Sequence, residues 1–301
     1  MMEKRQLGKT DMNVSVLGFG GSEIGYENAS QKTVTDLLGT ALDAGLNVID
    51  TAECYEDSEE LIGRAVSDRR DQFFLFTKCG HPDGFEMEAN WSAKSILQSI
   101  ERSLRRLRTD RVDIVHLHSC SEAVLRKGEA ISALQAARER GEARYIGYSG
   151  DSDAARYAVE CGAFDTLQTS INIADQEAIE LTLPLARDKQ MGVIAKRPIA
   201  NAAWKTGHKP TEGYHHTYYE RLQQLNYEFL PESDLERTIG IALHFTLSVP
   251  GVHTAIVGTT KAERWQQNAR LLEAGGLSDA EFQAIRQRWK ECAPQTWIGQ
   301  I

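Results

Sequence analysis

The chain has 301 residues, which is long for one ordinary domain but suits a single barrel of alternating strands and helices. Its composition, 41% hydrophobic and 26% charged, is typical of a globular protein. The net charge of -9 argues against a nucleic-acid partner, because non-specific binding to nucleic acid needs a basic surface.

The N-terminal segment predicts a β-hairpin. Residues 5–18, RQLGKTDMNVSVLG, place a turn near Lys9–Asp11 ahead of the first strand of the main sheet. No apolar run follows the first residues, so we expect no signal peptide. Nowhere does an apolar stretch approach the length of a membrane span, so we expect no membrane partner.

Short apolar runs alternate with longer helical patterns along almost the whole chain. Eight such runs are mostly apolar, as buried parallel strands should be. They are residues 16–20, 47–51, 73–78, 113–118, 145–149, 166–170, 192–197 and 254–258. Eight strands that are each followed by a helix predict a parallel (β/α)8 TIM barrel more readily than an open sheet.

The segments between these strands have helical periodicity. Residues 92–108 form an apolar stripe and begin at Ser92, which can cap a helix, and residues 121–141 end on Gly141. A long polar, aromatic-rich insertion at 198–233 precedes a helix at 234–248, and we expect it to lie over the active site. An extra C-terminal helix is predicted at 278–293. No linker or repeat divides the chain, so residues 1–301 are expected to form one domain.

Polar side chains gather at the predicted carboxyl ends of the strands, where barrels of this kind carry their chemistry. The residues are Asp50, Lys78, His118, Ser149, Gln168, Asn172, Lys196 and Arg197. Any one of them alone can be explained by a salt bridge that closes the barrel. Their accumulation on different strands at one face favours a functional site.

Three of these residues form a chemically sensible set with Tyr55. A phenol with a pKa of about 10 is a poor acid at neutral pH. A nearby ammonium such as Lys78 lowers that pKa, and a carboxylate such as Asp50 keeps the lysine charged and in place. His118 can then donate a hydrogen bond to a carbonyl oxygen. The set predicts a proton donor for the reduction of a carbonyl group.

A nucleotide site is expected after the last strand. The dinucleotide-binding glycine fingerprint is absent, because residues 18–25, GFGGSEIG, have Glu23 where the third glycine belongs. We interpret that segment as a turn at the top of the barrel, without a clear helix start. Residues 256–268, IVGTTKAERWQQN, run from a strand through a polar loop into a helix that carries Lys261 and Arg264. Such a helix N-terminus predicts an anion site.

The stretch at 47–66, NVIDTAECYEDSEELIGRAV, resembles the signature of the aldo-keto reductase family. Asp50 and Tyr55 fall on the positions of the family's aspartate and tyrosine. FLFTK brings Lys78 onto the catalytic lysine, and RVDIVHLH brings His118 onto the catalytic histidine. The resemblance covers essentially the whole chain. It implies hydride transfer between a nicotinamide cofactor and an aldehyde or ketone, or the matching alcohol, with Tyr55 as general acid and base.

The resemblance also implies a set of cofactor contacts, with NADP(H) as the expected cofactor and NAD(H) as the alternative. Ser149 and Gln168 would hold the nicotinamide carboxamide. The remaining positions would be Gly258, Thr259 and Thr260 in the phosphate loop, Arg264 at the 2'-phosphate and Asn268 at the adenine, with Gln267 also counted among the cofactor-binding residues. Apart from the resemblance, Lys196 and Arg197 are candidates for the pyrophosphate, as an alternative to a role in substrate binding. The chain departs from the family at Gly150, usually Asn, at Lys196, usually aromatic, and at Gln267, often Glu.

Two other functions remain open on the sequence alone. A non-catalytic, nicotinamide-nucleotide-binding sensor or regulatory subunit would fit the replaced aromatic residue. A zinc enzyme would use thiols and imidazoles at the ends of three strands, although no metal-binding spacing is present and we expect no metal. Those residues are Cys54, Cys79, Cys120, His81 and His118. Five cysteines in a long chain otherwise indicate reduced thiols in a cytoplasmic protein.

The insertion suggests a polar substrate. Within an acidic chain, residues 196–220 carry more basic than acidic side chains, and they also hold three histidines and three tyrosines. The charged residues are Lys196, Arg197, Lys205 and Lys209 against Glu212 and Glu220. Tyrosine faces and cationic donors suit ligands that are rich in hydroxyl groups or anionic, such as a sugar derivative. An exposed, merely solvated loop would have the same composition.

Overall fold

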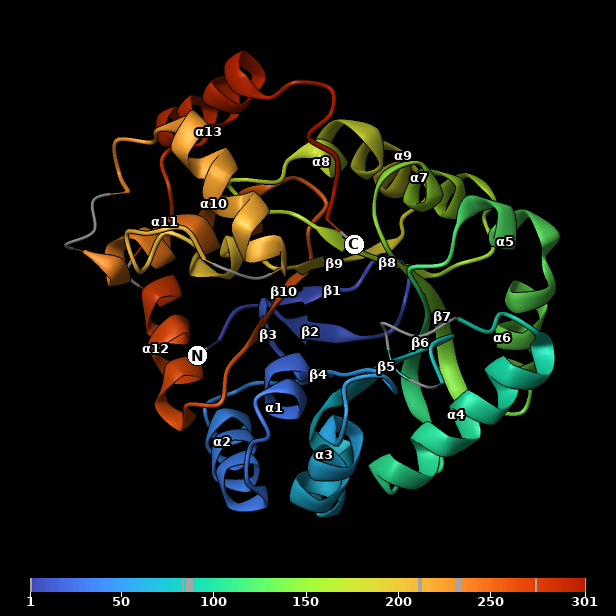
Figure 1. Ribbon diagram of the computed structural model, residues 1–301. Coiled ribbons are helices and arrows are strands. Elements are labelled where there is room, and N and C mark those ends of the chain that lie inside the picture. Colours follow the sequence, from blue (N-terminus) through green and yellow to red (C-terminus); the bar gives the residue numbers. More distant parts are fainter. Residues whose placement is uncertain are drawn as a thin grey trace.

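Eight parallel strands close into a barrel in the computed structural model, which describes residues 2–82, 84, 89–210, 213–230, 234–273 and 275–300 (Figure 1). The order is β10-β3-β4-β5-β6-β7-β8-β9, and β10 pairs with β3 to close the ring. The strands are β3 Leu17–Gly20, β4 Val48–Asp50, β5 Phe74–Cys79, β6 Val112–His118, β7 Ala143–Ser149, β8 Thr166–Ser170, β9 Gly192–Lys196 and β10 Thr254–Gly258. The predicted (β/α)8 barrel is confirmed.

Helices surround the strands as an outer ring (Figure 1). They are α2 Gln31–Asp43, α3 Ser58–Val66, α4 Ala93–Leu107, α5 Glu122–Lys127, α6 Glu129–Glu139, α7 Ser152–Glu160, α8 Glu177–Leu181, α9 Leu183–Asp188, α11 Leu235–Ser248 and α12 Ala262–Glu273. The structure also contains α1 Ser22–Tyr26, α10 Gly213–Leu225 and α13 Asp279–Cys292, with two 3-10 turns at Ser67–Gln72 and Ala200–Ala202. Among the described residues, no helix has both the length and the apolar character that crossing a bilayer requires.

The helix predictions agree with the structure where an apolar stripe follows an N-cap residue. Ser92 caps α4 by accepting a hydrogen bond from the Ser95 amide, and the predicted C-terminal helix is α13. The helix predicted at 121–141 is wrong in one respect, because Gly128 divides it into α5 and α6. Gly128 has φ +76°, a left-handed conformation that ends one helix and is easily adopted only by glycine.

The insertion at 198–233 contains helix as well as loop. Its helix α10 lies beside α13, outside the ring of the barrel (Figure 1). Residues 211, 212 and 231–233 of the predicted insertion lie outside the described residues.

The N-terminal hairpin closes the end of the barrel where the strands begin. Strands β1 Lys4–Gln6 and β2 Asn13–Ser15 pair antiparallel, as predicted. Apolar side chains from the hairpin pack against side chains of the barrel strands in a separate, buried cluster. The cluster consists of Leu7, Met12, Val14, Val48, Phe76, Ile114, Ile194 and Ile256. The barrel interior is therefore a packed core that opens only toward the carboxyl ends of the strands.

The hairpin turn approaches the start of β9 closely enough to require glycine at position 8. Gly8 has φ +55°, and a Cβ there would overlap backbone atoms of Gln190, Met191 and Gly192. The amide of Lys9 donates to the Gln190 carbonyl oxygen at 2.8 Å, which fixes this approach.

We predict that Gly8→Ala destabilises the fold far more than Gly128→Ala. Both positions have positive φ, but nothing lies within 4 Å of a Cβ at Gly128. Gly128→Ala should therefore cost about 1 kcal/mol of backbone strain, and Gly8→Ala about 1–3 kcal/mol more, because the backbone must shift. Denaturant unfolding of both variants measures the difference. Equal losses would show that the close approach at Gly8 contributes nothing.

Candidate active site

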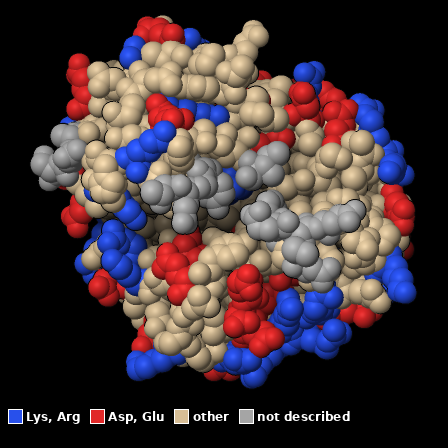
Figure 2. Space-filling model, viewed as in Figure 1, with Lys and Arg blue, Asp and Glu red and all other residues tan. Residues whose placement is uncertain are grey.

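A cleft of about 1030 Å³ lies at the carboxyl ends of the strands. Strand register brings its polar residues to the same end of the barrel: His118 pairs with Ser149, Ser149 pairs with Gln168, and Lys196 pairs with Ser170, two residues beyond Gln168. Charged side chains of both signs surround the hollow at the centre of this face (Figure 2). The sequence prediction that the polar strand ends share one face agrees with this register.

The deepest polar contact below the cleft is a buried ion pair. Lys78 Nζ lies 2.6 Å from Asp50 Oδ2 and donates a second hydrogen bond to the Thr51 carbonyl oxygen at 2.8 Å. Asp50 and Lys78 are each 1% exposed. Burial raises the pKa of Asp50, and the ammonium of Lys78 opposes that rise. The pair is thus a fixed charge pair shielded from water.

Two further side chains extend this pair across the barrel. Gln168 Nε2 donates to Asp50 Oδ1 at 2.8 Å, and Ser149 Oγ donates to Gln168 Oε1 at 3.0 Å. The chain of contacts joins strands β4, β5, β7 and β8. The amide of Gln168 is therefore held in one orientation, with its oxygen toward Ser149 and its nitrogen toward Asp50.

Tyr55 and His118 stand above the ion pair and line the cleft. Lys78 Nζ lies 5.0 Å from the centroid of the Tyr55 ring, and the rings of Tyr55 and His118 meet edge to face at 5.7 Å. Burial, and then the charge of Lys78, holds the pKa of His118 well below its usual value. The imidazole is therefore neutral and carries one donor nitrogen and one acceptor nitrogen.

Most of the predicted cofactor residues line the same cleft. They are Ser149, Gln168, Lys196, Arg197, Gly258, Thr259, Thr260, Arg264 and Asn268. Gln267, which is half-buried on α12, is not among the described residues that line the cleft. The loop from Gly258 leads into the first turn of α12, and Lys261 and Arg264 lie beside that helix N-terminus. This donor set fits an anionic, phosphate-bearing group.

The segment after β3 is more than the turn we predicted. Helix α1 begins at Ser22, one residue after Gly21, and the segment lines the cleft. The Glu23 carboxylate packs against Gly258, where any Cβ would overlap it, and Glu27 accepts a hydrogen bond from Thr260 Oγ1 at 2.8 Å. Two carboxylates thus face the predicted phosphate loop. The sequence analysis missed both, since α1 is too short to show helical periodicity.

A second buried ion pair lies across the cleft. Lys196 Nζ is 2.8 Å from Asp151 Oδ2, and Asp151 Oδ1 accepts from Thr169 Oγ1 and the Ser170 amide. Burial acts to raise the pKa of Asp151, but Lys196 and then Arg197 outweigh it and hold that pKa below its usual value. The sequence analysis missed Asp151, although it identified Lys196. The charge of Lys196 is therefore largely compensated within the protein.

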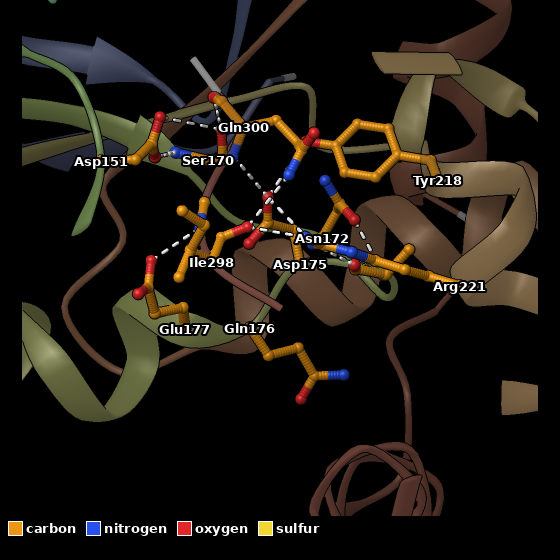
Figure 3. A network of polar contacts seen from close by, with 12 residues as sticks. Asp151, Ser170, Asn172, Asp175, Gln176, Glu177, Tyr218, Arg221, Ile298 and Gln300 are labelled. Atoms are coloured by element: carbon orange, nitrogen blue, oxygen red, sulfur yellow. Dashed lines mark hydrogen bonds and ion pairs between the residues drawn. The ribbon is translucent and has the colours of Figure 1, made fainter. Parts of the chain in front are cut away.

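The C-terminal tail crosses the end of the barrel and enters the cleft at Gln300. Figure 3 shows how the tail is bound. The backbone amide of Gln300 donates to Asp175 Oδ2 at 3.2 Å, and the Arg221 guanidinium donates to the backbone carbonyl oxygen of Ile298 at 2.7 Å. The Gly299 amide donates to Glu177 Oε2 at 2.7 Å. Arg197 reaches the Gln300 carbonyl oxygen from the cleft side. The tail is held by side chains from several elements of the barrel.

The zinc alternative finds no support in the geometry. No group of three or more histidine, cysteine, aspartate or glutamate side chains within the described ranges is arranged to hold a metal ion. Burial raises the pKa of Cys54 and of Cys120 to about 12, so in the metal-free protein both are thiols and not thiolates.

Comparisons with known proteins agree on one family. Residues 16–290 match the model of the aldo/keto reductase family. The chain is 27% identical to L-galactose dehydrogenase of Arabidopsis thaliana over 100% of its own length and 98% of that protein. It is 30% identical to the NADH-specific methylglyoxal reductase of Escherichia coli (strain K12), over 66% of the chain and 68% of that protein.

A solved structure matches the whole fold. The holo form of aldo-keto reductase AKR11C1 from Bacillus halodurans superposes with a TM-score of 0.83 at 28% sequence identity. The match covers 98% of this chain and 99% of the other. The likeness therefore extends over the barrel, the hairpin and the C-terminal segment together.

We predict that Asp175 makes stability fall as pH rises from about 4 to 7. Burial, and then the charge of Asp151, raises the pKa of Asp175 from 3.8 to about 7. Between these values the folded protein keeps a proton that the unfolded chain releases, so the free energy of unfolding decreases with rising pH. The slope from this one group is at most about 1.4 kcal/mol per pH unit.

The measurement compares wild type with Asp175→Asn in urea at pH 5 and at pH 8. In wild type the Tyr218 hydroxyl and the backbone amide of Gln300 each donate to Asp175 Oδ2 at 3.2 Å. The side-chain oxygen of an asparagine at this position can accept both hydrogen bonds and stays neutral at every pH. The stability advantage of wild type over the variant should shrink from pH 5 to pH 8. An advantage that grows over this interval contradicts the raised pKa.

Proposed function

The chain belongs to the aldo/keto reductase family, and on that premise we propose that it reduces an aldehyde or ketone with Tyr55 as the proton donor. The same residues would serve the reverse oxidation of the alcohol. The relatives described above are oxidoreductases by name, which supports a nicotinamide cofactor, and a bound NADP(H) would supply or accept the hydride. A small-molecule carbonyl or alcohol is the corresponding substrate.

The observation that carries the proposal is the buried Lys78–Asp50 pair directly below Tyr55. An ammonium 5.0 Å from the phenol ring stabilises the phenolate that remains after Tyr55 gives up its proton. Asp50 holds the ammonium at 2.6 Å and keeps it charged in a buried site. Tyr55 is thereby matched to donate a proton to an alkoxide as it forms on the substrate.

His118 would orient the substrate. Its imidazole is neutral, because burial and Lys78 hold its pKa low, and so it donates one hydrogen bond to a carbonyl oxygen without adding a second positive charge. Its ring lies 5.7 Å from that of Tyr55, so both side chains face one small volume of the cleft. A carbonyl oxygen in that volume would accept from both.

The cofactor would lie along the cleft from Gln168 to α12. Ser149 and Gln168, already oriented by Asp50, suit the amide of the nicotinamide. At the other end, Thr259 and Thr260 form the loop at the start of α12, and Asn268 on that helix is buried toward the cleft. We propose that this end holds the phosphates and the adenosine.

We propose that NADP(H) is preferred over NAD(H). Arg264 lines the cleft one turn into α12, and a guanidinium pairs well with a phosphate but not with a ribose hydroxyl. The carboxylate of Glu27, bonded to Thr260, acts in the opposite sense. NAD(H) use remains the alternative, as in the NADH-specific relative.

We propose a hydroxyl-rich substrate such as a sugar derivative. From the insertion, Lys205, His215 and Thr217 line the cleft. Lys209 and His216 instead pair with exposed Glu220. Because Asp151 compensates the positive charge of Lys196, the lining of the cleft offers a substrate hydrogen-bonding groups more than net positive charge. The name of one relative, L-galactose dehydrogenase, supports the same class.

We predict that Tyr55→Phe removes carbonyl reduction while leaving NADPH affinity nearly unchanged. The loss should be roughly 10²–10⁴-fold in kcat, the contribution of a positioned acid. Wild type and variant are assayed on a panel with sugar-derived and aromatic aldehydes of similar size, and NADPH binding is titrated separately. Near wild-type turnover by the variant would show that Tyr55 is not the acid. Binding of NADPH without turnover of any member by wild type would favour the sensor alternative.

We predict that Arg264→Ala weakens NADPH and leaves NADH little changed. The loss should be about 1.5–3 kcal/mol, the range for a hydrogen bond to a charged group. Fluorescence titration of wild type and variant with both cofactors gives the four dissociation constants. A matched control is Arg270→Ala, since Arg270 is exposed on the same helix and outside the lining. Equal affinity of wild type for both cofactors would contradict the preference.

A further inference from the structure

The thiol of Cys54 lies against the imidazole of His118, and the proposed reaction so far gives that contact no role. Cys54 Sγ is 3.4 Å from His118 Nδ1. Both residues line the cleft but are only 4% and 7% exposed. We propose that Cys54 is a positioning residue: its S–H donates to Nδ1 and thereby keeps the ring proton of His118 on Nε2.

The protonation states of the two groups support this arrangement. Burial raises the pKa of the Cys54 thiol to about 12, and the charge of Lys78 opposes the rise without overcoming it. Burial likewise holds the pKa of the His118 imidazole low. At neutral pH the pair therefore shares two protons, one on sulfur and one on the ring.

Two arrangements of those protons are possible, and they differ in strength. In the first, S–H donates to an unprotonated Nδ1, and Nε2 carries the ring proton. In the second, Nδ1–H donates to sulfur, and the thiol proton turns elsewhere. In the second arrangement the buried thiol proton is left without an acceptor, because His118 Nδ1 is the only hydrogen-bond partner of Cys54 Sγ among the described residues. A buried donor without an acceptor costs free energy, so the first arrangement is favoured.

The backbone on both sides of this contact is fixed. Glu53, the residue before Cys54, accepts from the amides of Gly80 and His81 through Oε1, and from Arg102 through Oε2 at 2.7 Å. His81 Nε2 in turn lies 2.8 Å from the carbonyl oxygen of His118 and, facing a carbonyl, is the donor. The thiol and the imidazole are therefore attached to one connected framework, which preserves their spacing.

The consequence concerns the carbonyl group and rests on the function proposed above. Only the Nε2-protonated tautomer presents an N–H on the side of the ring away from Cys54. The Nδ1-protonated tautomer would present a lone pair there and repel a carbonyl oxygen. Cys54 would thus select the form of His118 that binds substrate, without touching the substrate itself.

The test observes the tautomer directly, in the full chain labelled with ¹⁵N-histidine. A two-bond ¹H–¹⁵N correlation spectrum distinguishes protonated from unprotonated ring nitrogens, and His118→Gln identifies the His118 signals. Wild type should show Nε2 protonated. Cys54→Ala should give a measurable share of the Nδ1-protonated form, and Cys54→Ser, which keeps a donor, should restore the Nε2 form.

Cys79→Ala is the matched control. Cys79 is also a buried thiol at the top of the barrel, but it donates to the backbone oxygen of His116 at 3.4 Å. Its removal should leave the His118 tautomer unchanged. A loss of the Nε2 form in this variant as well would mean that general loosening of the barrel, and not the Cys54 contact, sets the tautomer.

Kinetics provide the second measurement. Cys54→Ala should lower kcat/KM for an aldehyde by about three- to tenfold, the effect of one net hydrogen bond on the tautomer ratio. NADPH affinity should not change, and Cys54→Ser should recover most of the loss. A wild type that carries the proton on Nδ1, or a Cys54→Ala spectrum identical to wild type, overturns the inference. Absence of carbonyl reduction in wild type would refute the proposed function alone, since the spectra are independent of turnover.

Discussion

The burial of the Lys78–Asp50 pair is the constraint on which the rest of the site depends. Removing two charges from water costs several kcal/mol per ion, and only close pairing with further hydrogen bonds offsets that cost. Here the Thr51 carbonyl oxygen and the Gln168 amide provide those bonds. Because these partners come from β4, β5 and β8 and from the turn after β4, the pair fixes the relative positions of those strand ends.

On the opposite side of the barrel, Lys196 and Asp151 form a second ion pair. Lys196 ends β9, and Asp151 precedes α7, so one ion pair again ties a strand end to a neighbouring loop. The Lys196 side chain is 12% exposed and the Lys78 side chain 1%, which leaves the second pair at the surface of the cleft and the first beneath it. The ion pair at the Lys78 end of the cleft is therefore more completely shielded from solvent than the pair at the Lys196 end.

The sequence predicted the barrel because each buried strand is a short apolar run, and six of the eight runs carry a polar residue at or near their end. That pattern is local, so the strand boundaries agree with the structure to within two residues. What escaped prediction depends on contacts between distant segments. The role of Asp151 becomes visible only from its ion pair with Lys196, and that of Gln300 only from its hydrogen bond to Asp175. Helix α1 and the break at Gly128 were not predicted for another reason. Five residues are too few to show an amphipathic pattern, and a break at a single residue hardly changes the pattern of the helices on either side.

The tail is held mainly through its backbone. Three of its contacts join barrel side chains to backbone atoms of the tail: Arg221 to the Ile298 oxygen, Glu177 to the Gly299 amide, and Asp175 to the Gln300 amide. Backbone atoms are the same for nearly every residue type, so the clamp does not depend on the side chains of Ile298 or Gln300. Gly299 is the exception, because a Cβ there would overlap Asp151. A change of the side chain at position 300 would therefore leave in place the backbone contacts that carry the tail into the cleft.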